Sequence, residues 1–147
     1  MRRWSRTALV LGVTAALLVT PGLRSAAGTT SKEQRVLKMI NASRSARGVG
    51  TLSLSERLSR IARRHSRDMA QQRLLFHHSC LSCRFPTGSW KLLGENVGSA
   101  SSLRRVHRMM LKSAAHRDIL LNGIFDRVGV GVVKRGGSYW VTEIFYA

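Results

Sequence analysis

Histidines and a carboxylate occur in three short polar segments of this 147-residue chain, each beside an apolar stretch. The segments are Phe76-His77-His78, Gly94-Glu95-Asn96, and Ser113 to Arg117, which contains His116. Imidazole nitrogens and carboxylate oxygens bind divalent metals, and imidazoles exchange protons near neutral pH. If the fold brings these segments together, they can hold a metal ion, a proton or a polar ligand.

The first 27 residues have the pattern of a secretory signal peptide. Arginines at positions 2, 3 and 6 precede an apolar run from Thr7 to Thr20, and Ser25-Ala26-Ala27 supplies the small residues of a cleavage site. The run is shorter than the roughly 20 residues that span a bilayer, which favours cleavage over anchoring. We expect a secreted, extracellular protein in which residues 28–147 form a single domain.

The charge of the chain is strongly positive, with a formal value of +18. Cleavage after residue 27 would remove four arginines and no acid, leaving about +14. Such a charge attracts anionic lipid head groups and anionic cell-surface polymers. Because the cations are spread along helices without interleaved aromatic residues, we expect no dedicated nucleic-acid binding.

Cys80 and Cys83 are the only cysteines, and export favours a disulfide between them. Closing so small a ring is expected to contribute about 2 kcal/mol. A thioredoxin-like pair is disfavoured because the cysteines lie in a loop and not at a helix start. A zinc site with His77 or His78 is disfavoured because residues so close in sequence rarely complete a tetrahedron.

Hydrophobic periodicity predicts helices first and strands last. Helices are expected at about 32–47, from a capping box at 53–56 to about 73, from 101 or 102 through 110, and as a short turn at 116–121. Two β-rich runs at 128–133 and 139–145 flank a hairpin turn at 135–138. Residues 74–100 are expected to be irregular, with a strand near 95–97. This order indicates an α+β layer architecture.

Six motifs follow one another along the chain, in this order: Asn41-x-x-Arg44-x-x-x-Gly48, Leu58-x-x-x-Ala62-x-x-His65-Ser66-x-Asp68-Met69-Ala70, Phe76-x-His78, Gly94-Glu95-Asn96, Ser113-x-x-His116-Arg117-x-Ile119-Leu120 and Val128-Gly129-Val130-Gly131. The series resembles the CAP superfamily (SCP/TAPS; cysteine-rich secretory, antigen 5 and pathogenesis-related type 1) in its bacterial secreted form. The resemblance covers about residues 33–147.

The resemblance implies an α-β-α sandwich with a central antiparallel sheet and a large cleft. Two histidines and two acids line that cleft in eukaryotic members, and in some they bind a divalent metal such as zinc. Carried over, the histidines are His78 and His116 and the first acid is Glu95. The second acid would fall near Ser113 and has no match. Two imidazoles and a carboxylate then leave a coordination position for water, as in catalytic zinc sites.

Neighbouring residues have weaker claims to the cleft. His77 is the rival of His78, and because adjacent residues of an extended segment point to opposite faces, we expect only one to face the cleft. Arg117 is a candidate for the cleft edge. His65 and His107 are expected to be partly buried helix residues. Asn96 is expected to fix a turn.

Two functions are compatible with these features. The favoured one is a binding module that holds a metal ion, a lipid or a peptide. The alternative is a metal-dependent, peptidase-like hydrolase in which Glu95 is the general base. The binding module is favoured because the sequence contains neither H-E-x-x-H nor G-x-S-x-G.

Overall fold

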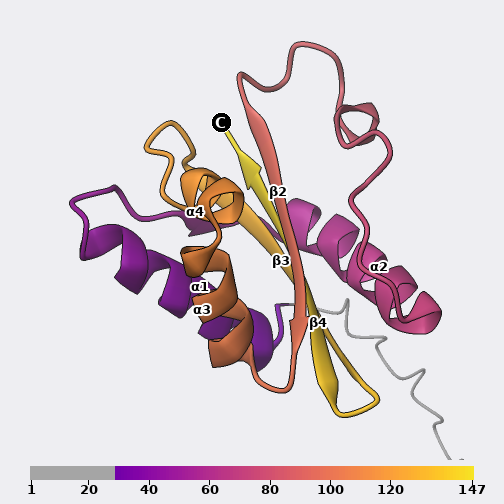
Figure 1. Cartoon of the computed structure of the whole chain (residues 1–147). Helices are drawn as coiled ribbons and strands as arrows, with labels where there is room; N and C mark the ends of the chain where they lie inside the picture. Colours follow the sequence, from indigo (N-terminus) through magenta and orange to yellow (C-terminus); the bar gives the residue numbers. More distant parts are fainter. Residues whose placement is uncertain (1–28) are drawn as a thin grey trace, which may run out of the picture.

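The computed structural model describes residues 29–147, so the predicted signal peptide at 1–27 lies outside the described residues. The elements are α1 (Ser31–Ser45), β1 (Ser53–Leu54), α2 (Glu56–Gln72), a 3-10 turn (Ser82–Arg84), β2 (Leu93–Ala100), α3 (Leu103–Lys112), α4 (Ala114–Leu120), β3 (Arg127–Arg135) and β4 (Ser138–Tyr146). Helix α2 covers one face of the sheet, and α1, α3 and α4 cover the other (Figure 1). The predicted α-β-α sandwich is confirmed.

The sheet has the strand order β1-β3-β4-β2. Strands β3 and β4 form the predicted hairpin, and β2 pairs antiparallel with β4. The short β1 pairs parallel with β3, so the sheet is mixed and not antiparallel throughout. Strand β2 is an edge of the described sheet.

Two sequence predictions were wrong at their boundaries. The capping box at 53–56 does not start a helix, because Ser53 belongs to β1 and its N–H donates to Asp126 O at 2.9 Å. Ser55 caps α2 instead. Strand β2 is longer than the three residues expected, because it pairs with β4 without a break from Leu93 to Ala100. Gly94 lets Ile119 pack closely on it, since a Cβ there would lie 2.9 Å from Ile119 Cγ2.

The buried arginine of α1 connects that helix to the far end of α4. Arg44 is fully buried, and its guanidinium donates to the carbonyls of Gly50, Leu120, Asn122 and Phe125. Burial lowers the pKa of Arg44. Since unpaired buried donors are costly, these four carbonyls fix the loop that follows α4 and hence the position of that helix.

Helix α2 lies directly on β3 because two glycines leave room for it. A Cβ on Gly129 would lie 2.2 Å from Leu58 Cβ, and one on Gly131 would lie 2.2 Å from the backbone carbon of Ala62. These distances are far below van der Waals contact. The backbone of α2 therefore packs against the sheet without an intervening layer of side chains.

A carboxylic acid is buried in the sheet opposite a site segment. Glu143 is 1% exposed and pairs in register with Asn96 across β4 and β2. Burial raises the pKa of Glu143 to about 8, although a hydrogen bond from Asn96 acts in the opposite direction. The carboxyl group is therefore mostly protonated at neutral pH. The Asn96 amide also donates to His116 O at 3.0 Å, which connects β2 to α4.

Gly131→Ala is expected to destabilise the domain by about 3 kcal/mol, because its Cβ would overlap the backbone of α2. Gly50→Ala is the matched control: its Cβ would meet no atom within 4 Å, and we expect a change within about 0.5 kcal/mol. Urea unfolding followed by circular dichroism measures both. Equal losses in the two variants would contradict the direct contact between α2 and β3.

Glu143→Gln is expected to change how stability depends on pH. In the wild type the unfolded chain releases this proton near pH 4.5 while the folded protein keeps it to about pH 8, so the free energy of unfolding falls across that window. The variant lacks this loss and should be more stable than the wild type at pH 8 by roughly 2–4 kcal/mol. Denaturant unfolding at pH 4.5 and pH 8 tests this, and equal pH slopes in the two proteins would refute the assignment.

Candidate functional site

Glu95 of β2 is the centre of the site, where histidine donors surround its carboxylate. The ring Nδ1 of His77 lies 2.8 Å from Glu95 Oε1, and the backbone N–H of His78 donates to the same oxygen at 3.0 Å. The ring Nδ1 of His78 bonds the other oxygen, Oε2. Both carboxylate oxygens are therefore occupied by donors from the segment that precedes the disulfide loop.

Two opposing effects set the charge of Glu95. Its side chain is 6% exposed, and burial alone would raise the pKa of Glu95. Hydrogen bonds from the ring and backbone of His78 and from the ring of His77 outweigh burial and hold that pKa below its usual value. Glu95 is thus an ionised carboxylate in a largely dry place, which gives it a strong attraction for a cation.

His65 approaches the same carboxylate from α2. It is buried, its Nε2 lies 2.7 Å from Phe76 O, and its ring stacks on that of His78 with centroids 3.8 Å apart. Burial is the main cause that lowers the pKa of His65, so its ring is neutral at pH 7. The ligand atoms of His65, His78 and Glu95 all lie within 4.8 Å of one another.

The hydrogen bonds identify which ring nitrogens are free. A carbonyl oxygen only accepts, so Nε2 of His65 carries the proton and its Nδ1 keeps a lone pair. Nδ1 of His78 bonds the carboxylate, so Nε2 is the ring nitrogen of His78 that lies outside this bond. Two imidazoles and a carboxylate are the donor set of a three-ligand zinc site, so the residues present fit zinc.

His116 lies on α4, outside the group of three. Its Nδ1 lies 2.8 Å from Ser113 Oγ, and Asn96 holds its backbone carbonyl. Burial, followed by the nearby charge of His77, lowers the pKa of His116. His116 and Ser113 form the polar end of a neighbouring cavity. The assignment of His116 as a metal ligand stays a prediction.

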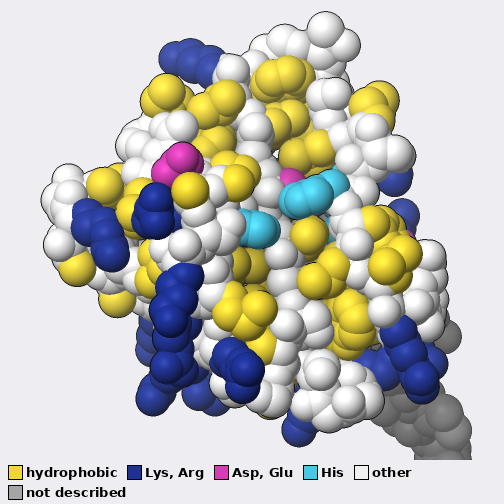
Figure 2. Space-filling view, in the orientation of Figure 1, with side chains coloured by type: hydrophobic (Ala, Val, Ile, Leu, Met, Phe, Trp, Pro, Cys, Tyr) yellow, Lys and Arg dark blue, Asp and Glu magenta, His cyan; other side chains and the backbone are white. Residues whose placement is uncertain are grey.

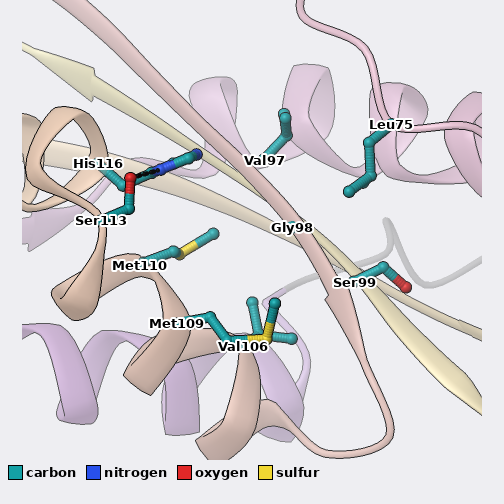
Figure 3. Close-up of a pocket in the computed structure, with 9 residues that line it drawn as sticks. All are labelled: Leu75, Val97, Gly98, Ser99, Val106, Met109, Met110, Ser113 and His116. Atoms are coloured by element: carbon teal, nitrogen blue, oxygen red, sulfur yellow. Dashed lines mark hydrogen bonds between the residues drawn. The ribbon is translucent and has the colours of Figure 1, made fainter.

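That cavity is mainly apolar and has a volume of about 200 Å³. Figure 3 shows its lining: Leu75, Val97, Gly98, Ser99, Val106, Met109, Met110, Ser113 and His116. It runs along β2 from the segment after α2 to the helices α3 and α4. Figure 2 shows histidine side chains near the middle of this face, with hydrophobic side chains around them and Lys and Arg at the lower left.

The structure places the remaining sequence candidates as follows. The expectation that only one of the adjacent histidines would reach the cleft is wrong, because His77 and His78 both bond Glu95, with side chains 58% and 7% exposed. Arg117 donates to Leu111 O at 3.5 Å, which joins α4 to the end of α3. Asn96 lies in a strand and not in a turn.

His65 was predicted to be a buried helix residue, and its part in the site was missed. The one signal in the sequence was its position on the apolar side of α2, three residues after Ala62 and four before Met69. His107 is also buried, but its Nε2 pairs with Ser43 Oγ at 2.8 Å on the other side of the sheet.

The predicted disulfide between Cys80 and Cys83 is present, with Cα atoms 5.4 Å apart. It begins two residues after His78 and closes a loop that overlaps the start of the 3-10 turn. Restraining this loop limits the freedom of the segment that carries His77 and His78. Among residues 29–147, no helix has the length and apolar character needed to cross a membrane.

Comparison with known proteins places these features in a family. The family model of the cysteine-rich secretory protein (CAP) family matches residues 37–145. The uncharacterized protein YkwD of Bacillus subtilis strain 168 is 31% identical over 119 residues, which cover 76% of this chain and 46% of YkwD.

Solved structures with this fold come from several sources. An extracellular protein with an SCP domain from Bacillus anthracis is 27% identical, with a TM-score of 0.68, and the match covers 78% of this chain and 40% of that one. An outer surface protein of Borrelia burgdorferi has a TM-score of 0.69 at 19% identity, covering 80% of this chain and 94% of that one. NaASP2, solved with Zn²⁺, has a TM-score of 0.59 at 14% identity, covering 82% of each chain.

The chain spans less than half the length of YkwD and of the B. anthracis protein. Within this chain, however, the family match extends from α1 to β4 and includes every element that carries the site. The protein therefore belongs to the cysteine-rich secretory protein (CAP) family.

Proposed function

We propose that this protein is a secreted, cationic binding module whose cleft holds a divalent metal ion and the apolar part of a lipid or peptide. The observation that carries the proposal is the buried, ionised Glu95 beside two imidazoles within 4.8 Å. Secretion is supported by the signal-peptide pattern and by the description of the B. anthracis relative as extracellular.

Zinc is the metal that the donor set favours. His78 and Glu95 belong both to the triad expected from the sequence and to the group in the structure. For the third ligand we propose His65 in place of His116, because only His65 lies within 4.8 Å of both. A bound ion would supply Lewis acidity and an open coordination position. NaASP2, which has the same fold, was solved with Zn²⁺.

The apolar cavity beside the histidines supports a ligand with a hydrocarbon part. At about 200 Å³ it is smaller than the sites that enclose whole drug-sized molecules, so it fits a segment of an acyl chain or one apolar side chain. Ser113 and His116 offer hydrogen bonds at one end. Binding there would bury Leu75 and Met109, which are 46% and 51% exposed.

The electrostatics of Glu95 support binding over hydrolysis. A general base works best with a pKa near the working pH, whereas the pKa of Glu95 is held below its usual value. Its two oxygens are also engaged by histidine donors. The lowered pKa that favours a bound cation makes Glu95 a weak base.

Zinc should bind with a stoichiometry of one, measured by isothermal titration calorimetry. We expect His78→Ala and His65→Ala each to weaken binding by at least tenfold, since each removes a nitrogen ligand. Affinity should rise from pH 5 to pH 7, because protons compete with zinc for the imidazole lone pairs.

Two controls make the metal experiment decisive. His107→Ala removes an equally buried histidine remote from the cleft and should leave zinc affinity unchanged. His116→Ala should change it by less than threefold. If His116→Ala abolishes binding while His65→Ala does not, the third ligand is the one that the family resemblance implies. Melting curves without metal establish that each variant is folded.

The positive charge is expected to hold the protein on anionic surfaces. Arg105, Arg108 and Lys112 of α3 are exposed beside Met109 and border a shallow depression. Sedimentation with phosphatidylglycerol vesicles should fall at least tenfold between 50 and 300 mM salt, because screening shortens the reach of surface charges. Replacing the three cations by Gln should reduce binding at low salt. Retention that does not depend on salt would remove charge as the cause.

A further inference from the structure

A second cavity lies between the C-terminal end of α2 and the β3–β4 hairpin. It has a volume of about 310 Å³ and is lined by Ala70, Arg73, Arg135, Gly136, Ser138 and Trp140. It shares no lining residue with the cavity beside His116. The function proposed above for the His65, His78 and Glu95 site and the apolar cavity does not involve this second cavity.

The charge of this cavity is positive and uncompensated. Two exposed arginines, Arg73 and Arg135, line it, and none of its lining residues is an acid. Within residues 29–147 neither arginine belongs to an ion pair. Two like charges beside one cavity repel each other, and an anion between them relieves that repulsion.

The cavity also has an aromatic side chain in its lining. Trp140 lines the cavity, and its indole Nε1 is buried and bonds no other described residue. Indole N–H is a donor only, and leaving it unpaired away from water costs free energy. The hydroxyl of Ser138 adds a further donor to the lining. The donors that an oxyanion in the cavity can meet are thus those of Arg73, Arg135 and Ser138, whereas the indole Nε1 of Trp140 is shielded from it.

The backbone holds the two arginines in place. The N–H of Arg73 donates to Met69 O, and its φ of 54° ends α2 in the left-handed conformation. Arg135 pairs in register with Ser138 at the end of the hairpin. The carbonyl end of α2 opposes an anion, but Met69 O there is already bonded by two N–H groups, those of Arg73 and Leu74. Two full charges therefore outweigh the remaining helix dipole.

From these observations we infer that this cavity is a phosphate-binding site. Guanidinium groups form paired hydrogen bonds with phosphate oxygens, and the Ser138 hydroxyl can add a further donor. The phosphate can be the free ion or an ester on a lipid head group or polymer. The inference is independent of the proposed metal site, because the two share no residue.

The indole N–H of Trp140 is a built-in reporter for the test. In ¹H–¹⁵N spectra of ¹⁵N-labelled protein, titration with inorganic phosphate at constant ionic strength should move the Trp140 indole resonance and saturate. The indoles of Trp4 and Trp90 should stay in place, and Trp140→Phe identifies the Trp140 signal among the three. Sodium chloride at the same ionic strength should move neither. No saturable shift of the Trp140 signal would overturn the inference.

Arginine variants separate a site from general charge attraction. Arg135→Gln should weaken phosphate binding at least tenfold, whereas Arg105→Gln, which removes the same charge from α3, should change it less than twofold. Equal weakening by the two variants would mean that the shift reports an adventitious ion only. A parallel titration with glycerol 3-phosphate distinguishes the sources: tighter binding than inorganic phosphate indicates an ester, and weaker binding indicates the free ion.

Discussion

The direct contact between the backbones of α2 and β3 is the constraint on which the site depends. Because Gly129 and Gly131 have no side chains, α2 lies against the sheet at Leu58 and Ala62. His65 follows Ala62 by about one helical turn, and it therefore lies over the sheet beside β2. A layer of side chains between helix and sheet would move His65 away from Glu95.

The chemistry of the site follows from the balance between burial and hydrogen bonding at Glu95. Burial alone would favour the neutral acid, but donors from His77 and His78 keep it ionised. The neutral ring of His65 stacks on His78 and fixes the segment through Phe76 O. The carboxylate of Glu95 is thus negatively charged, largely shielded from water and surrounded by imidazoles. This environment favours binding of a cation over proton transfer.

A second acid contributes to the site without touching it. Glu143 is kept protonated by burial and lies opposite Asn96, whose amide holds the backbone of His116. Two acids from neighbouring strands therefore have opposite charge states: Glu95 is ionised because histidines donate to it, and Glu143 is neutral because little compensates its burial. Arg44 fixes the loop after α4 and so helps to hold α4, the helix that carries His116, in position.

Much of the fold could be predicted from the sequence, because periodicity and turn residues act locally. The helices, the β3–β4 hairpin and the disulfide follow from such signals, and motif order placed Glu95 and His78, which are in contact, in one site. The extent of β2 could not be predicted, because glycines such as Gly94 and Gly98 are typical of loops. In the structure both lie in the strand, where side chains of other elements pack closely against them. His65 could not be assigned, because its place depends on how α2 crosses the sheet.

We propose that His65, His78 and Glu95 form a cation site. Crystals soaked in zinc, with diffraction recorded on both sides of the zinc absorption edge, test this proposal. We predict an anomalous peak among the side chains of these three residues. A peak elsewhere, such as beside His116 and Ser113, or no peak near Glu95 at saturating zinc, would contradict it.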